Sequence, residues 1–352
     1  MPRTFRHLWD HFISFENLQL AWRNARRGKR RKPAAAAFEW EAESHLFDLQ
    51  DELLAGTYQH QPYHTFVVTE HGKRRLISAA HFRDRVVHHA LYSVLAPIWE
   101  PRFHAHSYAC RPGKGSHRAV DRCQALARRY PYVLQCDIKQ FFPAIDHTIL
   151  RTTLTRQLAD QRVLDVVDRV LASGDGVLRH EYTPMLFPGD DLLALGRPRG
   201  LPIGNLTSQF WANVYLHPLD LHIAHALRCT GYVRYCDDLL LFSADKAQLH
   251  HWRDQLIAAA AGLRLTLHEA RAQVYPTRCG IPWLGWVVYP THRLLKRRCG
   301  IAFRRRYRML TAAYRARRIG LKRLTASVQG WTAHVAHGDT FGLRRAIFEQ
   351  PL

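Results

Sequence analysis

Hydrophobic residues along the chain follow two different spacings, which predict helices in some segments and strands in others. Apolar positions three or four residues apart indicate amphipathic helices, and short unbroken or alternating apolar runs indicate strands. The predicted helices are residues 14–28, 38–55, 83–99, 150–172, 208–227 and 245–261, with a helical tail from residue 297 onward. The predicted strands are residues 132–136, 263–267 and 283–289, with a hairpin at 65–78 and a strand pair at 232–243. Because helices and strands mix without a regular βαβ alternation, we expect an α+β fold.

Segments between these elements add two expectations. Residues 174–200 are rich in Gly, Pro and Asp, which is typical of a loop or a short insertion. No apolar run approaches the roughly 18 residues that cross a bilayer, and the first 15 residues lack the apolar stretch of a signal peptide. The seven cysteines are scattered without a metal-ligand spacing, and reduced thiols fit the cytosol. We therefore expect a soluble, cytoplasmic protein.

Charge changes the picture because it is unevenly placed. The chain has 51 Lys and Arg against 29 Asp and Glu, a net charge of +22, while its 47% hydrophobic content is enough for a large core. Residues 1–33 carry +7 and residues 290–352 carry +13, which leaves +2 for all the rest. Such basic flanks predict that the ends of the chain hold a polyanion. Solvated helix faces or an arginine-rich codon usage are the alternatives.

Two adjacent carboxylates, Asp237 and Asp238, interrupt the apolar run of residues 232–242. Like charges in a buried strand cost several kcal/mol unless they are solvated, paired or bound to a cation. A hairpin tip at residues 236–238 would resolve this cost. Taken alone, the pair would be read as an ordinary β-turn.

A third carboxylate, Asp137, has the same setting at the end of the strand predicted at 132–136. Two acid-tipped strands lying side by side would offer oxygen ligands to Mg²⁺. Two metal ions held in this way support in-line nucleotidyl transfer.

These motifs resemble those of reverse transcriptases. The segment Tyr235-Cys236-Asp237-Asp238 resembles the YxDD box of the family, and residues 137–142 resemble its first-aspartate box, D-x-K-x-F-F. The run Trp283-Leu284-Gly285-Trp286 resembles the primer-grip hairpin. Residues 83–87 and 107–115 are similar to two fingers motifs of bacterial retroelement enzymes, so the resemblance extends over about residues 60–290.

The resemblance implies a catalytic role for each acid. Asp137 and Asp237 would bind two Mg²⁺ ions, or Mn²⁺ as a substitute, with help from the Ile138 carbonyl. Asp238 would be the third acid, nearer the primer end. A departure from the family pattern is Arg271, which stands where a Lys is usual and, because of its high pKa, is a poor proton donor to pyrophosphate. We leave its role open.

The resemblance also implies residues for the incoming nucleotide. Lys73, Arg75 and Arg111 would hold the triphosphate, although a solvated hairpin surface is the alternative for the first two. Phe142 would exclude a 2′-hydroxyl and so select deoxynucleotides; without the family it would be read as a core residue.

The segment at residues 200–209, Gly-Leu-Pro-Ile-Gly-Asn-Leu-Thr-Ser-Gln, indicates a subfamily. Enzymes of diversity-generating retroelements are similar in carrying I-G-N-x-x-S-Q there, where many bacterial relatives have a Gln in place of Ile203. By position, Ile203 and Gln209 would line the nascent base pair. We hypothesise that Ile203 loosens base-pair checking, in keeping with error-prone copying at template adenines. A buried strand residue is the alternative for Ile203.

The resemblance implies a right-hand polymerase in three regions. These are a basic helical extension at residues 1–60, fingers and palm at 61–289, and a basic helical thumb at 290–352. Four thumb arginines would grip the template–primer duplex, namely Arg304, Arg305, Arg306 and Arg308. The implied partners are template RNA, a cDNA or DNA primer, deoxynucleotides, structured RNA and a small basic accessory protein that forms oligomers. The rival hypotheses are another bacterial reverse transcriptase, such as a phage-defence type, and a non-catalytic RNA-binding scaffold.

Overall fold

The computed structural model describes residues 4–70 and 73–349, and it mixes helices with small antiparallel hairpins and sheets, as the sequence predicts for an α+β protein. The chain forms two compact units that interleave in sequence. Unit 1 takes residues 1–105, 137–228 and 254–268, and unit 2 takes 106–136, 229–253 and 269–352. The functional boundaries predicted at residues 60 and 290 stay predictions.

Unit 1 is mainly helical and packs around one central helix, α5 (Phe82–Trp99). Its first half carries α1 (Trp9–Ile13), α2 (Phe15–Arg26), α3 (Pro33–Trp40) and α4 (Ala42–Leu54), and its second half carries α7 (Phe141–Ala144), α8 (His147–Thr155), α9 (Gln161–Ser173), α10 (Leu206–Leu221) and the π-helical turn η3 (His222–Ala226). Helices α1, α2, α3 and α10 all contact α5, whose Val86, Val87 and Leu91 are completely buried. The apolar spacing that predicted a helix at 83–99 is therefore confirmed.

Two of the predicted helices are each split in two. The segment 38–55 breaks at Glu41, whose φ of −123° and ψ of 44° leave the helical region, so α3 and α4 are separate. The segment 150–172 breaks before Asp160, whose carboxylate accepts a hydrogen bond from the Val163 amide and begins α9. The second break is thus a side-chain N-cap, whereas the first is a turn of the backbone without a side-chain cap. Apolar spacing alone reveals neither of them.

The structure corrects other predictions as well. The strand expected at residues 263–267 is only an isolated bridge between Leu267 and Ile138. The helix expected at 208–227 begins two residues earlier and ends as the π-helical turn. Helix α6 (Ser116–Arg129) and strand β6 (Gln273–Pro276) were not predicted from the apolar pattern.

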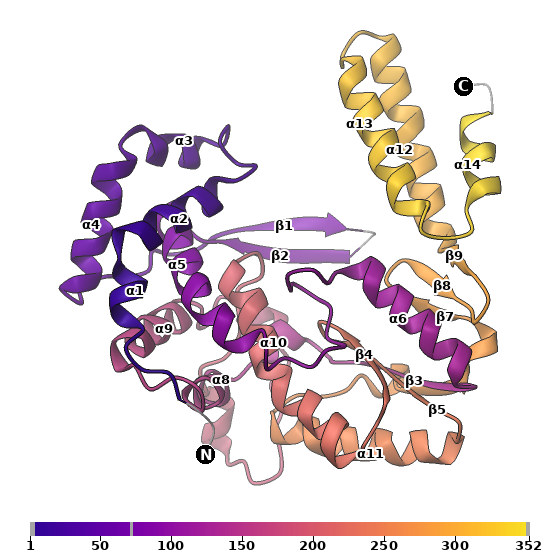
Figure 1. Cartoon of the computed structure of the whole chain (residues 1–352), viewed down its shortest axis with the longest axis horizontal. Helices are drawn as coiled ribbons and strands as arrows, with labels where there is room; N and C mark the ends of the chain where they lie inside the picture. The colour runs from indigo at the N-terminus through magenta and orange to yellow at the C-terminus, as the bar shows by residue number, and fades with distance from the viewer. Residues whose placement is uncertain (1–3, 71–72, 350–352) are drawn as a thin grey trace. The chain divides into compact units, whose positions relative to one another are not determined.

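Strands β1 (His64–Glu70) and β2 (Lys73–Ala79) form an antiparallel ribbon in unit 1, which confirms the predicted hairpin. Figure 1 shows this ribbon projecting from the helical part of the unit. Its apolar side chains at Phe66, Val67 and Val68 are 41–47% exposed. The ribbon thus has little core of its own.

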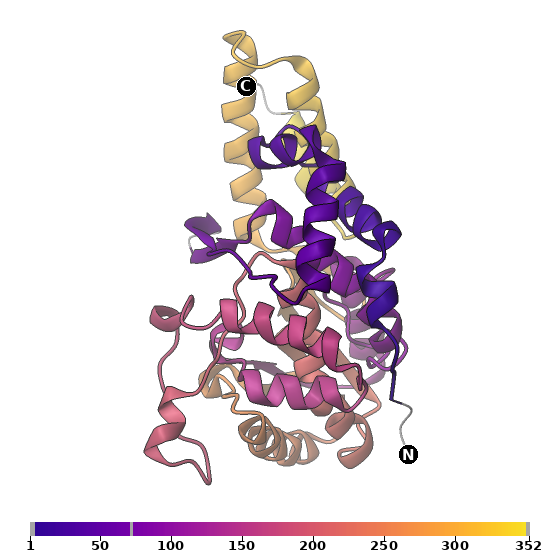
Figure 2. The same cartoon turned by 90° about the vertical axis from the view of Figure 1, so that its left-hand side faces the viewer.

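The segment between α9 and α10 contains two short 3₁₀ turns, η1 (Arg179–Glu181) and η2 (Leu192–Gly196). This agrees with the loop or short insertion predicted at residues 174–200. Figure 2 shows it extended away from the neighbouring helices of unit 1. Ion pairs fasten it: Arg197 binds Asp190 at 2.6 Å and Asp146 at 3.6 Å, and Arg264 binds the same two acids at 3.3 and 3.4 Å.

Unit 2 contains two small sheets. The first has the order β4-β5-β3-β6, with β3 (Tyr132–Asp137), β4 (Gly231–Tyr235), β5 (Asp238–Ser243) and β6 (Gln273–Pro276). The last residue of β3, Asp137, is already part of unit 1. The second has the order β7-β8-β9, with β7 (Ile281–Trp283), β8 (Trp286–Val288) and β9 (Arg293–Leu295). Apolar side chains of α6 pack with Val233, Leu240, Trp283 and Trp286 into one core. The adjoining helix α11 (Lys246–Gly262) contains residues of both units.

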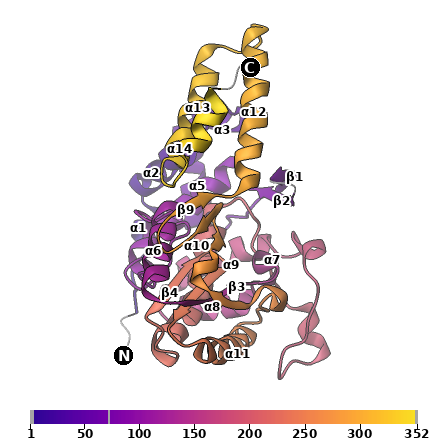
Figure 3. The same ribbon diagram turned by 90° about the vertical axis from the view of Figure 1, so that its right-hand side faces the viewer.

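The last part of unit 2 is helical, as expected from residue 297 onward. Helices α12 (Arg297–Arg315), α13 (Leu321–Val335) and α14 (Phe341–Phe348) lie side by side (Figure 3). They share a small core in which the rings of Phe303 and Trp331 stack with centroids 3.9 Å apart. Within the described parts of the chain, no helix is both long enough and apolar enough to cross a membrane.

Candidate active site

The strand pair β4–β5 places Asp237 and Asp238 at a tight turn. Tyr235 pairs with Asp238, so the loop contains only Cys236 and Asp237. Two-residue hairpin loops need a positive φ at their first position, and Cys236 has a φ of 57°. This backbone conformation is costly for a residue with a side chain, and such strain is concentrated at functional sites. The hairpin tip that the sequence predicted at residues 236–238 is confirmed, and both acids are half-buried there.

A buried arginine supports this turn. Arg234 is completely buried and donates a hydrogen bond from a guanidinium nitrogen to the Cys236 carbonyl at 3.0 Å. Its own amide and carbonyl bond His106 and Tyr108, both at 2.9 Å. Burying a guanidinium is expensive unless it is bonded, so this side chain fixes the loop that carries the acids. Sequence reasoning missed Arg234, although a lone arginine inside an apolar strand was the available signal.

Two other groups of unit 2 interact electrostatically with the acids. Burial, and then the neighbouring Asp237 carboxylate, holds the pKa of the Cys236 thiol well above its usual range, so the thiol stays protonated. Lys296 interacts with Asp238, and burial lowers the pKa of its ammonium group. The Lys296 amide also bonds the Gly285 carbonyl at 2.9 Å. Lys296 is a second residue that the motifs did not point to.

Asp137 is the last residue of β3, and β3 is the neighbour of β5 in the sheet order. Its carbonyl accepts a hydrogen bond from the His268 amide at 2.7 Å, and the next residue, Ile138, is 2% exposed. The carboxylates of the three acids are the hard oxygen donors that Mg²⁺ prefers. Among residues 4–70 and 73–349, however, no group of three His, Cys, Asp or Glu side chains is arranged to hold a metal ion. The metal ligands therefore stay a prediction.

The residues predicted to hold the triphosphate lie on different elements. Arg75 is exposed on β2 of unit 1. Lys73 begins the same strand, and its side chain lies outside what the structure describes. In unit 2, a guanidinium nitrogen of Arg111 donates a hydrogen bond to the Ser107 carbonyl at 3.0 Å, so this arginine is held in place. Their role toward a nucleotide stays a prediction.

Ile203 lies in a turn that is fastened to the β1–β2 ribbon. The Ser78 amide of β2 donates to the Ile203 carbonyl at 2.8 Å. Asn205 bonds the Ser78 carbonyl at 2.8 Å and accepts from the Ala80 amide at 3.2 Å. A Cβ at Gly204, whose φ is 115°, would lie 3.0 Å from Ile77, so the close approach suits only glycine. Ile203 is half-buried in this turn and is therefore not a buried strand residue.

This turn leads directly into α10, where Gln209 is exposed in the first turn. Phe142 lies on the short helix α7 and is half-buried, whereas its neighbour Phe141 is 2% exposed and belongs to the core. The Leu201 amide donates to the Phe142 carbonyl at 2.9 Å, which ties α7 to the Ile203 segment. Phe142, predicted to exclude a 2′-hydroxyl, and Ile203 and Gln209, predicted to line the nascent base pair, thus lie on connected elements of unit 1. Asn205, to which no motif assigned a role, is a further functional candidate.

The predicted primer grip is a hairpin, but its tryptophans are core residues. Trp283 pairs with Trp286 across a two-residue loop in which Leu284 and Gly285 have φ values of 44° and 88°. Trp283 is 1% and Trp286 is 2% exposed. The two tryptophans therefore hold the hairpin, and only Leu284 and Gly285 are accessible at its tip.

The arginines predicted to grip the template–primer duplex lie on the exposed face of α12. Phe303 faces the helical core, and Tyr307 is half-buried beside it. The exposed arginines are Arg304, Arg305, Arg306 and Arg308. This division of α12 into a packed face and a basic face agrees with the interleaved pattern in the sequence.

Comparison with known proteins adds independent information. Residues 64–288 match the family described as reverse transcriptase (RNA-dependent DNA polymerase). The chain is 24% identical over 292 residues to Protein YkfC of Escherichia coli strain K12, with 71% of each chain covered. It is 30% identical over 150 residues to an uncharacterized 91 kDa protein in the cob intron of Schizosaccharomyces pombe, covering 42% of this chain and 17% of that protein. It is 24% identical over 181 residues to the group II intron-encoded protein LtrA of Lactococcus lactis subsp. cremoris, covering 51% and 28%. The chain thus spans less than a third of either intron protein.

Proposed function

Since the chain belongs to the reverse transcriptase family and is an RNA-directed DNA polymerase, we propose that Asp137, Asp237 and Asp238 form its catalytic centre. The observation that carries this proposal is the two-residue β4–β5 loop, which sets two carboxylates at a strained turn above a buried arginine. The order of the sheet supports the third member, because Asp137 ends the strand next to β5. Divalent metal ions such as Mg²⁺ are typical of the family, and when bound they activate the primer 3′-hydroxyl and neutralise charge on the triphosphate.

The residues of the chain would share the remaining tasks. Asp137, Asp237 and Asp238 would supply the oxygen ligands, and Arg75, Lys73 and Arg111 would bind the triphosphate of the deoxynucleotide. Phe142 would exclude a 2′-hydroxyl. Leu284 and Gly285 at the β7–β8 tip would contact the primer, near Lys296.

We also propose that the chain copies a template-repeat RNA into cDNA mutated at adenines, for targeted diversification of a gene. The supporting feature is Ile203, an apolar residue in a turn fastened to β2 and connected to Phe142. An apolar side chain at the nascent base pair cannot donate or accept the hydrogen bonds that a Gln offers, so it would test base pairing less strictly. Structured RNA and a small basic accessory protein would be partners in this role.

Sequencing cDNA made by the purified chain tests this subtype. With RNA from its own locus and Mg²⁺, the native chain should misincorporate opposite adenine more often than opposite other bases, and Ile203→Gln should reduce this bias. Ile203→Val, which keeps an apolar side chain, is the matched control and should retain the bias. Unchanged adenine errors in Ile203→Gln would remove the proposed role of Ile203.

The same experiment separates the rival functions. Faithful cDNA from a locus without paired template and variable repeats would favour a different purpose, such as phage defence. The similarity to intron-encoded proteins makes work on intron RNA another outcome to score. Absence of any Mg²⁺-dependent incorporation would favour an RNA-binding scaffold.

A further inference from the structure

A cavity of about 330 Å³ lies in unit 1, between α3, α4 and the start of α5. This volume is at the lower end of the range for small-ligand sites. Every residue that lines it falls within 34–83, so the cavity belongs wholly to unit 1 and is separate from the acids of the β4–β5 turn. None of the functions assigned above uses it.

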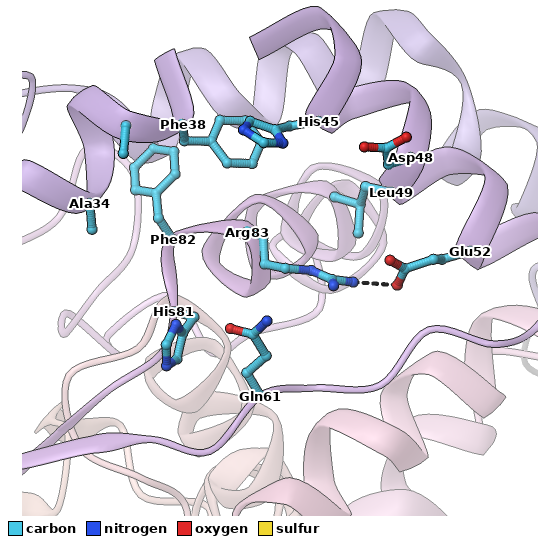
Figure 4. A pocket seen from close by; sticks show the side chains of 11 residues that line it. Ala34, Phe38, His45, Asp48, Leu49, Glu52, Gln61, His81, Phe82 and Arg83 are labelled. Carbon is cyan, nitrogen blue, oxygen red and sulfur yellow. Dashed lines mark hydrogen bonds and ion pairs between the residues drawn. The ribbon is translucent and has the colours of Figure 1, made fainter. Parts of the chain in front are cut away.

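The walls of the cavity combine flat groups from two sides. The rings of Phe38 and His45 lie together with centroids 4.9 Å apart, and Phe38 also contacts Phe82 at 5.1 Å. Figure 4 shows Phe38 and His45 along one side, with the Arg83 side chain extending across the cavity opposite them. Aromatic rings and guanidinium planes are the two surfaces on which proteins stack unpaired bases.

The Arg83 guanidinium is fixed before any ligand binds. It forms an ion pair with Glu52 and lies over the Tyr58 ring at 5.5 Å. Beneath it, the completely buried Asp84 accepts hydrogen bonds from the Tyr58 hydroxyl at 3.0 Å and from the Gln61 amide at 3.1 Å. A preorganised wall of this kind reduces the entropy lost on binding.

The polar edge of the cavity is selective. Asp48 is exposed at this edge, and among the residues that the structure describes it has no ion-pair or hydrogen-bond partner. An ionised carboxylate only accepts hydrogen bonds, so it favours bases that carry an amino group and disfavours uracil. Guanine is the best match, because its amino group and ring N–H lie side by side.

The surroundings of the cavity suit the backbone of an RNA. Residues 26–32 hold six Lys and Arg and lead into α3. Arg26 and Arg30 both pair with Glu39 of α3, which folds this tract back along the helix. The exposed Arg27, Arg31 and Lys32 lack acidic partners within the described residues. At the other end of α3, Trp40 is 87% exposed and offers another ring for stacking.

We propose that this cavity binds one unpaired guanine base of an RNA, while residues 27–32 hold the adjacent phosphates. The pocket would read a base in a loop or bulge of structured RNA and so fix where the enzyme sits on it. The proposal requires only that the chain works on RNA. It does not depend on adenine mutagenesis or on the assignment of the three acids.

Equilibrium binding without deoxynucleotides tests the pocket directly. The probes are labelled RNA stem–loops that differ in one bulged nucleotide, which is guanosine, uridine or absent. The full-length chain should bind the guanosine bulge about tenfold more tightly than the uridine bulge at the same salt concentration. Equal affinity for the three probes would overturn the proposal and would leave the polymerase function untouched, because no incorporation is measured.

Two pairs of variants locate the effect. Asp48→Ala removes the acceptor and Ala37→Phe fills the cavity, so both should abolish the preference for guanosine. Asp51→Ala on α4 and Ala36→Phe on α3 make the same changes at exposed positions that do not line the cavity, and both should keep it. Circular dichroism melting verifies that each variant is folded. A guanosine preference that survives in folded Asp48→Ala and Ala37→Phe would contradict the assignment of this cavity.

Discussion

Two hairpins of this protein are built on opposite principles. In the β4–β5 hairpin, Val233, Leu239, Leu240 and Leu241 are at most 1% exposed, and the loop is as short as a hairpin allows. In the β1–β2 ribbon, the apolar side chains of β1 at residues 66–68 are 41–47% exposed, and the strands are seven residues long. An isolated two-stranded ribbon is marginally stable in water.

The difference suggests how each hairpin would serve polymerisation in the roles proposed above. Carboxylates that must hold a fixed geometry benefit from a rigid frame, which the core and Arg234 supply. A ribbon proposed to contact an incoming nucleotide needs only one firmly attached end, which the hydrogen bonds of Ser78 and Asn205 supply at the Ile203 turn. Its exposed apolar residues offer a surface for nucleic acid to cover. Four variants test this contrast, from the largest expected effect to the smallest.

Removing the buried support of the β4–β5 turn should have the largest effect of these four. Arg234→Met deletes the hydrogen bond to the Cys236 carbonyl and leaves that carbonyl without its donor, at a cost of about 3 kcal/mol in the free energy of unfolding. We expect kcat to fall at least tenfold while KM changes little, measured by steady-state incorporation. Arg234→Lys keeps the charge and should recover part of the stability. A folded Arg234→Met enzyme with native kcat would show that the turn does not need this support.

Loosening the base of the ribbon should act on nucleotide binding. Asn205→Ala loses its bonds to the Ser78 and Pro202 carbonyls and to the Ala80 amide, which together contribute about 1–3 kcal/mol. We expect KM for the deoxynucleotide to rise about tenfold, with a smaller change in kcat. Asn24→Ala, an exposed position on α2, is the control. A fall in kcat alone would mean that both hairpins act on the chemical step.

Neutralising the exposed arginines of α12, in the proposed thumb, should weaken a third, purely electrostatic contact. Changing Arg304, Arg305 and Arg306 together to Gln should lower affinity for the template–primer duplex and reduce the slope of log K against log salt by up to about three. Fluorescence anisotropy over a range of salt concentrations measures both. Arg345→Gln on α14, whose side chain pairs with Glu349, should have no such effect. An unchanged slope in the triple variant would mean that these arginines form an ordinary solvated helix face and do not contact the duplex.

Mild acid should have the smallest effect, through histidines of unit 2. His117 of α6 bonds His334 of α13 at 3.0 Å, and its ring lies 3.7 Å from that of His337. Burial and the neighbouring histidines lower the pKa of His117, and burial and His337 lower that of His334. These histidines therefore bind protons more readily in the unfolded chain than in the folded one. Their contribution to the free energy of unfolding is fully present above the ordinary histidine pKa near 6.5 and declines as the pH falls below it. Nearby Asp121 opposes the shift on His117, and Arg293 adds to it.

Urea midpoints at pH 7.5 and pH 5.5 measure this dependence. The native chain should unfold at lower urea at pH 5.5, and His117→Asn should show a smaller difference between the two midpoints. Buried histidines of unit 1 change stability in the same direction, among them His89, whose pKa burial lowers to about 4, and they are unchanged in this variant. An equal pH difference in both proteins would exclude the α6–α13 contact as a source.

The sequence predicted best where backbone pattern and chemistry coincide. Asp237 and Asp238 stand in an apolar run that only a hairpin tip can accommodate, and the structure has that tip. It predicted less where the role of a residue depends on tertiary contacts. The residues around Trp283 in the sequence do not show whether it is a core residue or a primer contact. The hydrogen bonds of Asn205 could not be predicted either, because they join segments more than 120 residues apart. The role of Arg234 likewise becomes clear only from its hydrogen bond to the Cys236 carbonyl.

Single-turnover incorporation by Asp237→Asn tests the central claim, that the β4–β5 turn carries the chemistry. The assay extends a DNA primer on an RNA template with Mg²⁺, and Asp245→Asn, at an exposed acid just after β5, is the control. The claim predicts that Asp237→Asn lowers the rate at least about a hundredfold, while Asp245→Asn stays within about twofold of the native chain. A folded Asp237→Asn protein that extends the primer at the native rate would contradict it.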